Sequence, residues 1–203
     1  MDRRGHWDQV YAAKRADEVS WHQRSPQRSL ALIGGLGLGA EGAIIDVGAG
    51  ASSLVDELLA RGFRRITTID IAAAALEHSR ARLGERARLV RWVVGDVLDE
   101  IPGGPYDLWH DRAVFHFLTD AADRERYAAN LRAALAPGGH AIIATFAPDG
   151  PQKCSGLEVA RHDGASIAAA VGLRLVKEER EEHVTPWGAV QRFVYAVLGG
   201  AES

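Results

Sequence analysis

Residues 44–53 read Ile-Ile-Asp-Val-Gly-Ala-Gly-Ala-Ser-Ser, and this stretch decides the fold class of the chain. The apolar run before it is typical of a short buried strand, and the glycines at positions 48 and 50 turn the chain into a helix. Glycines let the backbone approach a ligand closely, and a helix N-terminus offers unpaired N–H groups. The dinucleotide fingerprint has a third glycine where this chain has Ser53, so a purely structural turn stays open.

Strand-like and helix-like segments alternate outward from this stretch. Strands are predicted at residues 43–47, 66–71, 89–94, 106–110 and 140–146, and helices at residues 52–61, 72–83 and 121–136. A helix at 163–171 and strands at 173–182 and 191–198 follow, and the short connection between those two strands permits only an antiparallel hairpin. We therefore predict an α/β fold, a Rossmann-like doubly wound sheet of seven mostly parallel strands with an antiparallel C-terminal hairpin and helices on both faces.

Length and composition restrict the classes of protein that the chain can represent. We expect one domain over residues 1–203, with an N-terminal helical extension or lid at 1–42 and the Rossmann-like core at 43–203. The 24 basic and 27 acidic residues give a net charge of −3, so neither nucleic acid nor a membrane is an expected partner. The single cysteine, Cys154, excludes an internal disulfide and a multi-cysteine metal site, and no metal is expected. A cytoplasmic location and a monomer or homodimer are the remaining expectations.

Two further acids follow the second and third predicted strands. Asp70 lies 20 residues after Gly50, a spacing that suits a carboxylate accepting both hydroxyls of a ribose. Asp96 is placed to accept from the exocyclic amine of adenine. Each acid alone is more often a solvated loop residue or a helix cap. A glycine turn and two acids at three consecutive strand ends nevertheless describe an adenosine site.

With these motifs in order, and with the Leu-Ala-Pro-Gly-Gly turn at 135–139, the chain resembles the class I S-adenosylmethionine-dependent methyltransferases. The resemblance implies S-adenosylmethionine as cofactor and S-adenosylhomocysteine as product. It also implies the role of each cofactor residue. Asp46 would hold the glycine loop and the methionine ammonium, Gly48 and Gly50 would pass under the methionine, Asp70 would bind the ribose, Ile71 would contact the adenine, and Asp96 with the Val97 backbone would meet the adenine edge.

Finer resemblances leave the acceptor open. The segment Asp-Arg-Ala at 111–113 is similar to the D-R-G segment of thiopurine and thiol or halide methyltransferases, with Ala113 in place of glycine. The N-terminal region, with Trp7 and Trp21, resembles their paired-tryptophan start, and Trp21 is expected to form a lid because it precedes a polar turn. The glycine loop and residues 69–71 instead resemble a group of protein-lysine methyltransferases, from whose D-K-G segment Arg112 departs.

The end of the fourth strand is expected to border the reactive methyl group. Asp111 and His110 are therefore the candidate catalytic residues, for acceptor orientation or proton removal, although Asp111 could equally pair with Arg112 or cap the next helix. His116 is expected to be a core or wall histidine. The leading hypothesis is methyl transfer to a small molecule, with a thiol or related soft nucleophile favoured. The alternatives are a protein-lysine N-methyltransferase, a non-catalytic S-adenosylmethionine-binding module and a nicotinamide dehydrogenase.

Overall fold

The structure is a computed structural model that describes residues 2–13, 18–99 and 101–199. Residues 1 and 14–17 of the expected N-terminal extension lie outside the described residues. The helices are α1 (Arg3–Ala13), α2 (Gln27–Gly35), α3 (Leu54–Ala60), α4 (Ala73–Leu83), α5 (Ala121–Ala134) and α6 (Gly164–Val171), with short 3-10 turns η2 (Gly84–Leu89) and η3 (Phe115–Phe117). The strands are β1 (Ala43–Val47), β2 (Arg65–Asp70), β3 (Val90–Val94), β4 (Tyr106–Arg112), β5 (Leu135–Phe146), β6 (Lys153–Cys154), β7 (Leu157–Glu158), β8 (Arg174–Val184) and β9 (Val190–Gly199).

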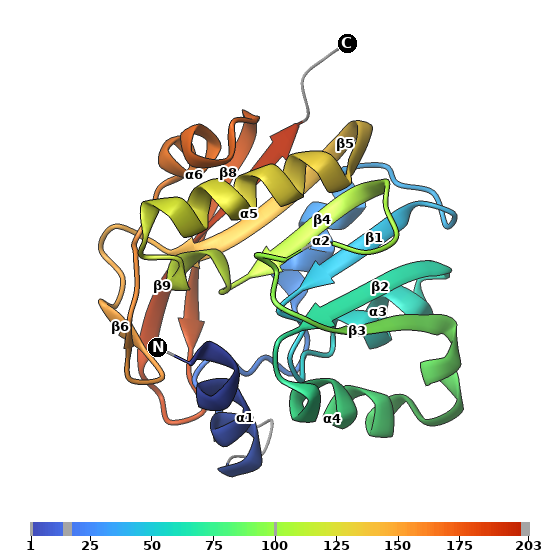
Figure 1. Ribbon diagram of the computed structural model, residues 1–203, viewed down its shortest axis with the longest axis horizontal. Helices are drawn as coiled ribbons and strands as arrows, with labels where there is room; N and C mark the ends of the chain where they lie inside the picture. The colour runs from blue at the N-terminus through green and yellow to red at the C-terminus, as the bar shows by residue number, and fades with distance from the viewer. Residues whose placement is uncertain (1, 14–17, 100, 200–203) are drawn as a thin grey trace.

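One seven-stranded sheet organises the chain, in the order β3-β2-β1-β4-β5-β9-β8 (Figure 1). Strands β1 to β5 run parallel, and β9 pairs antiparallel with both β5 and β8. The strand order therefore reverses between β1 and β4. In open sheets of this kind, ligands bind at the carboxyl ends of the strands beside that switch point. The predicted fold class is confirmed, including the antiparallel C-terminal hairpin.

Helices cover both faces of the sheet, because the central strands are buried on both sides. One apolar cluster packs the sheet against α5 and α6, and it includes Tyr127, Leu131 and Ile167. The other packs the sheet against α2 and α3, through residues such as Leu30 and Leu58. Figure 1 shows α5 in front of the sheet and α2 and α3 behind it, with α1 beside α4 below the carboxyl edge of β1 and β2.

Two of the differences from the sequence-based prediction lie near the end of the sheet that carries the site. Strand β4 continues to Arg112, two residues beyond the predicted end at His110. The segment after β5, for which no strand was predicted, contains the small hairpin of β6 and β7. The first difference matters most, because side chains alternate between the two faces of a strand. It places residues 110 and 112 on one face of β4 and residue 111 on the other.

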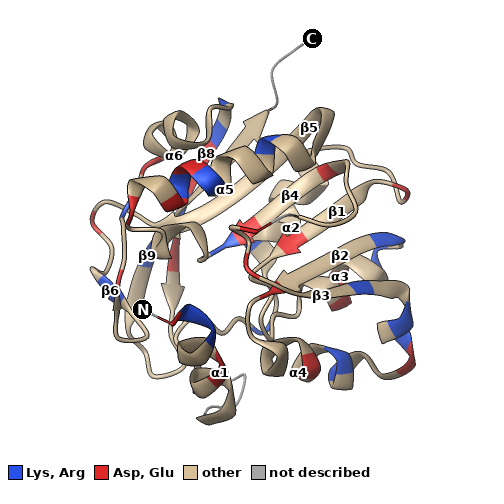
Figure 2. Ribbon diagram, in the orientation of Figure 1, with Lys and Arg blue, Asp and Glu red and all other residues tan. Residues whose placement is uncertain are grey.

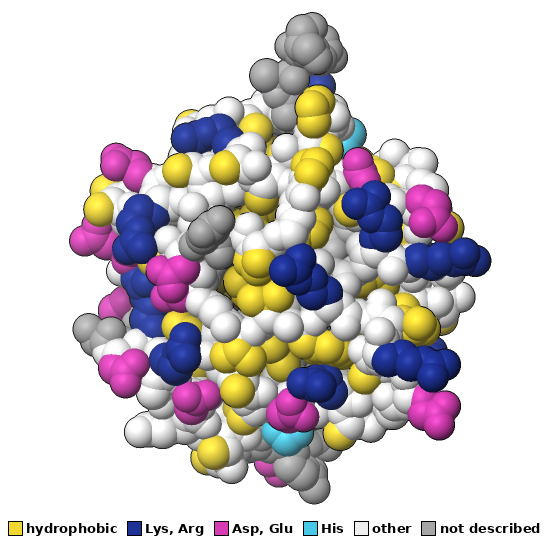
Figure 3. All heavy atoms as spheres, turned by 45° about the vertical axis from the view of Figure 1, so that its right-hand side comes forward, with side chains coloured by type: hydrophobic (Ala, Val, Ile, Leu, Met, Phe, Trp, Pro, Cys, Tyr) yellow, Lys and Arg dark blue, Asp and Glu magenta, His cyan; other side chains and the backbone are white. Residues whose placement is uncertain are grey.

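The surface is mixed in charge. On the face shown in Figure 3, basic side chains stand apart from one another, separated by apolar and neutral surface, with acidic side chains among them. Within the part of the chain that the structure describes, no helix combines the length and apolar character that a membrane span requires.

Candidate active site

A deep pocket opens at the carboxyl ends of β1, β2, β3 and β4. It brings together all eight residues that the sequence predicted for cofactor binding. They are Trp21, Asp46, Gly48, Gly50, Asp70, Ile71, Asp96 and Val97. His110 also lines this pocket, whereas Asp111 does not. Figure 2 shows acidic residues at the carboxyl ends of β1, β2 and β4.

The glycine loop between β1 and α3 leaves space only for glycine at two positions. A Cβ atom at Gly48 would lie 1.9 Å from Val114 Cγ2, and one at Gly50 would lie 2.5 Å from the hydroxyl oxygen of Tyr11. Both glycines also have positive φ angles, +61° and +54°, a backbone conformation that residues with a side chain rarely adopt. The loop therefore runs as bare backbone along the pocket wall, which suits close passage of a ligand.

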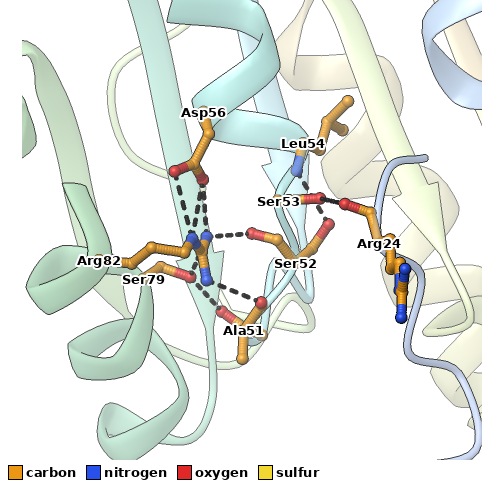
Figure 4. Close-up of polar contacts among 9 residues, drawn as sticks. Arg24, Ala51, Ser52, Ser53, Leu54, Asp56, Ser79 and Arg82 are labelled. Atoms are coloured by element: carbon orange, nitrogen blue, oxygen red, sulfur yellow. Dashed lines mark hydrogen bonds and ion pairs between the residues drawn. The ribbon is translucent and has the colours of Figure 1, made fainter. Parts of the chain in front are cut away.

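Arg82 of α4 binds the backbone of this loop through hydrogen bonds (Figure 4). Its guanidinium donates to the carbonyl oxygens of Ala51 at 3.1 Å and Ser52 at 2.6 Å, and it also pairs with Asp56 at 2.7 Å. Ser79 donates to the Gly50 carbonyl at 3.1 Å. These bonds turn three loop carbonyls away from the pocket, and the loop conformation is fixed before any ligand arrives.

Asp70 ends β2 beside the glycine loop. Its carboxylate accepts hydrogen bonds from Gly50 N at 2.8 Å and from Ala72 N at 2.9 Å, one at each oxygen. A carboxylate has further acceptor positions on both oxygens, which are left for ligand hydroxyls. Burial raises the pKa of Asp70 to about 6, against the lowering effect of the two backbone hydrogen bonds. A ligand that donates to the charged carboxylate would relieve this cost.

Asp96 follows β3 and is more exposed than Asp70. One of its oxygens accepts from Leu98 N at 2.9 Å, and the other lies 3.9 Å from the guanidinium of Arg3. Arg3 also pairs with Asp123 of α5, and α1 is thereby linked to this edge of the pocket. Val97 is buried beside Asp96. This geometry is compatible with an adenine edge at Asp96.

Asp46, His110 and Ser29 form a buried chain of hydrogen bonds on one wall of the pocket. Asp46 and His110 are neighbours in register on the parallel strands β1 and β4. Asp46 Oδ1 lies 2.7 Å from His110 Nδ1, and His110 Nε2 lies 2.9 Å from Ser29 Oγ of α2. Because both ring nitrogens are engaged, His110 is poorly placed to take a proton from an acceptor. Its geometry instead fits a residue that orients Asp46.

Asp111 lies on the opposite face of β4 and does not line the pocket that His110 lines. Its carboxylate is fully buried and accepts from Val114 N at 2.9 Å, Phe115 N at 3.1 Å and the Tyr127 hydroxyl at 2.6 Å. Burial raises the pKa of Asp111 to about 6, although each of these hydrogen bonds lowers it. These contacts agree with the alternative expectation of a capping role, because Asp111 binds backbone N–H groups at the start of η3, and among the described residues it forms no ion pair with Arg112.

His116 is a core residue, as expected. Its side chain is fully buried, and burial lowers its pKa to about 3. The imidazole is therefore neutral at physiological pH. Its Nδ1 accepts from Phe146 N at 3.4 Å. Cys154 is buried in β6 and lines the pocket.

An aromatic cluster roofs the pocket. Trp7 packs edge-on against Trp21 and Phe117, at ring-centroid distances of 5.7 and 5.0 Å. Tyr11 packs against Trp21 at 6.3 Å, and its hydroxyl lies over Gly50. Burial, with a smaller effect from Asp70, raises the pKa of Tyr11, so the phenol keeps its proton. Helix α1 and the segment that holds Trp21 thus cover the cofactor half of the pocket.

The residues that line the pocket and that received no binding role from the sequence include Arg3, Tyr11, Ser29 and Arg112. For Arg112, a signal was present in the sequence. Extending the two-residue alternation of β4 beyond His110 would have placed residue 112 on the same face as His110. For the other three no local signal exists, because their positions depend on how α1 and α2 pack on the sheet.

The switch-point pocket, the glycine loop and the strand-end acids together define a protein that binds an adenosine-containing cofactor. Residues 45–141 match the family model of a methyltransferase domain. Nodulation protein S of Rhizobium tropici is 32% identical over 99 residues, which are 49% of this chain and 41% of that protein. The matched chain thus spans less than half the length of this relative.

Solved structures of low sequence identity share the fold. The N-methyltransferase NodS from Bradyrhizobium japonicum WM9, in complex with S-adenosylhomocysteine, superposes with a TM-score of 0.73 at 19% identity, covering 96% of this chain and 98% of that chain. A protein of echinomycin biosynthesis, described for the conversion of a disulfide bond into a thioacetal group, gives a TM-score of 0.79 at 18% identity, covering 97% and 92%. Residues 45–141 are thus similar to a methyltransferase domain, and the chain has the fold of the methyltransferases solved in these structures.

Proposed function

We propose that this protein transfers the methyl group of S-adenosylmethionine to a small-molecule acceptor whose nucleophile is a thiol or a related soft atom. The observation that carries the proposal is that both residues expected to act as a base are engaged elsewhere. Asp111 binds two backbone N–H groups and Tyr127, and His110 bridges Asp46 and Ser29. An acceptor that needs little help with its proton suits such a site.

Because neither Asp111 nor His110 is free to act as a base, the site favours an acceptor whose nucleophile loses its proton easily. A thiol has a pKa of about 8.5, so a few per cent is already thiolate near neutral pH. An aliphatic alcohol or a lysine ammonium needs a base to become nucleophilic. His22 lines the pocket and is the remaining imidazole on the acceptor side. It is the residue that we expect to receive a proton if one has to be removed.

The cofactor supplies a methyl group that is already activated on a sulfonium, so the chain has to bind, orient and exclude water. We assign the methionine end to Asp46 and the bare backbone at Gly48 and Gly50, the ribose to Asp70, and the adenine to Ile71, Asp96 and Val97. The roof of Trp7, Tyr11 and Trp21 would shield the reacting atoms. The aromatic enclosure favours a compact acceptor over an extended protein segment.

Nitrogen methylation is the second candidate, and a specific observation favours it. The structural relative NodS is described as an N-methyltransferase, and another with a TM-score of 0.68 is a 1,6-didemethyltoxoflavin N1-methyltransferase from Burkholderia thailandensis. A ring nitrogen or a neutral amine also needs no strong base. The two candidates differ in the acceptor atom and share every assigned cofactor contact.

A methyl-transfer screen tests the proposal. The purified protein is incubated with S-adenosylmethionine and, separately, with thiols, phenols, amines and a lysate protein fraction, and the S-adenosylhomocysteine formed is measured. We expect turnover with thiols first and amines second. Methyl label on protein would favour the lysine alternative. Cofactor binding without turnover on any class would favour a non-catalytic module, and binding of NAD alone would overturn the cofactor assignments.

A further inference from the structure

The two halves of the pocket carry opposite charge. The half built on β1, β2 and β3 presents the carboxylates of Asp46, Asp70 and Asp96. The half built on the end of β4, next to β9, presents the guanidinium of Arg112. The acidic half suits the positively charged sulfonium and ammonium groups of the cofactor. The half with Arg112 suits a negatively charged group instead.

Arg112 is held rigidly by neighbours that do not neutralise it. Its Nε donates to the Tyr195 hydroxyl at 3.0 Å, one terminal nitrogen donates to the Trp21 carbonyl at 3.0 Å, and its Cζ lies 4.7 Å from the centre of the Phe193 ring. Among the described residues, no carboxylate forms an ion pair with this guanidinium within 4.0 Å. Glu181 is linked to Arg112 only through Tyr195, whose hydroxyl donates to the Glu181 carboxylate at 2.9 Å.

The second terminal nitrogen of Arg112 has no partner. It is shielded from water, and within the described part of the chain no acceptor lies at hydrogen-bond distance. A buried donor left without a partner costs about 1–3 kcal/mol, and more when the group is charged. Arg112 lines the pocket, so an oxyanion bound there would supply the acceptor that this nitrogen lacks.

We infer that Arg112 anchors an acceptor subsite for a carboxylate, carried on a flat, largely apolar small molecule. The inference rests on the proposed function, because it assigns the acceptor half of the same pocket. A guanidinium binds a planar oxyanion through well-directed hydrogen bonds, and the aromatic walls of Trp7, Trp21 and Phe117 suit a ring beside it. The proposed acceptor therefore carries a negative charge in addition to its nucleophilic atom.

Paired probes of nearly the same shape, one an anion and one neutral, test the inference. The protein saturated with S-adenosylhomocysteine is titrated with benzoate and with benzamide, and binding is followed by calorimetry and tryptophan fluorescence. We expect benzoate to bind at least about tenfold more tightly, a difference of about 1.4 kcal/mol. In Arg112→Gln this preference should disappear, and in Arg112→Lys most of it should remain. The exposed Arg192→Gln, on the strand β9 whose Tyr195 contacts Arg112, is the matched control and should keep it.

The outcomes separate the two proposals. Equal affinity for benzoate and benzamide, binding of neither, or a preference that survives in Arg112→Gln would overturn the subsite. A loss of S-adenosylhomocysteine affinity in Arg112→Gln equal to the loss for benzoate would also overturn it, because the guanidinium would then hold the carboxylate of the cofactor. If Arg112→Gln does not fold, Arg112→Lys decides, and loss of the preference there with the charge retained contradicts the inference. Failure of the wild type to bind S-adenosylhomocysteine counts against the proposed function instead.

Discussion

Asp70 and Asp111 are both buried carboxylates at the ends of parallel strands, and in both burial raises the pKa to about 6. They differ in the face of the sheet from which they project. Asp70 keeps acceptor positions directed at the pocket, whereas Asp111 gives its oxygens to η3 and to Tyr127 of α5. A perturbed pKa therefore identifies a buried charge, and the direction of the side chain decides whether that charge serves a ligand or the fold.

The largest effect is expected from Asp111→Ala. Two backbone N–H groups and the Tyr127 hydroxyl would lose their acceptor, and unpaired buried donors cost about 1–3 kcal/mol each, so the free energy of unfolding should fall by about 3–5 kcal/mol. Urea unfolding measures this. The exposed cap Asp120→Ala is the control and should cost about 1 kcal/mol. If the Asp111→Ala protein is as stable as the wild type but has lost turnover, Asp111 has a catalytic role and not a structural one.

The second effect is a pH dependence of stability due to Asp70. Its pKa is 3.8 in the unfolded reference and about 6 in the folded protein, so the folded state binds more protons between these values. Stability from this group is complete below about pH 4 and is lost as the pH rises through 6, by up to about 3 kcal/mol. Asp70→Asn cannot ionise. The unfolding free energy of this variant relative to wild type should therefore rise between pH 4 and pH 7, and a constant difference would contradict the assignment.

The same substitution should weaken cofactor binding. Asp70→Asn replaces charged acceptors for ligand hydroxyls by a neutral amide, which costs about 1.5–3 kcal/mol, or about 10–100-fold in S-adenosylhomocysteine affinity. Calorimetry at pH 7.5 measures the change. Asp111→Asn is the matched control, and its folded fraction should bind S-adenosylhomocysteine normally. An equal loss of S-adenosylhomocysteine affinity in both variants would contradict the assignment of Asp70, but not Asp111, to the cofactor.

The smallest effect concerns the chain from Ser29 through His110 to Asp46. Ser29→Ala removes the hydrogen bond at His110 Nε2 and leaves Asp46 less well oriented, so S-adenosylhomocysteine affinity should fall by about two- to fivefold. 5′-Methylthioadenosine lacks the amino-acid end of the cofactor, and its affinity should not change. Ser166→Ala, at the start of α6, is the control. Equal losses for both ligands would indicate a general structural role for Ser29.

The fold followed from the sequence because the alternation of apolar strands and helices from Ala43 onward is a local pattern. The cofactor residues followed as well, since a parallel sheet brings the carboxyl ends of its strands to one edge and Asp46, Asp70 and Asp96 each stand at such an end. Their binding roles remain predictions. The acceptor side was harder to predict, because β4 continues through Arg112, so that Asp111 is a strand residue facing away from His110 and not a loop residue beyond the strand.

Long-range packing accounts for the rest. The position of Tyr11 over Gly50 depends on how α1 packs beside α4, and the contact of Ser29 with His110 depends on how α2 covers the sheet. Nothing within a few residues of either position signals these contacts. The hairpin of β6 and β7 has only two residues in each strand, too few for a periodic pattern to be read.

Helix α1 lines the pocket through Trp7, through Tyr11 above Gly50 and through Arg3 beside Asp96. The last two contacts lie at positions assigned to the cofactor. A cofactor bound there would lie beneath α1, so its entry and departure would require this helix to move. We expect the rate of exchange of S-adenosylhomocysteine for S-adenosylmethionine to follow the opening of this helix, so that product departure rather than methyl transfer limits the speed of the catalytic cycle.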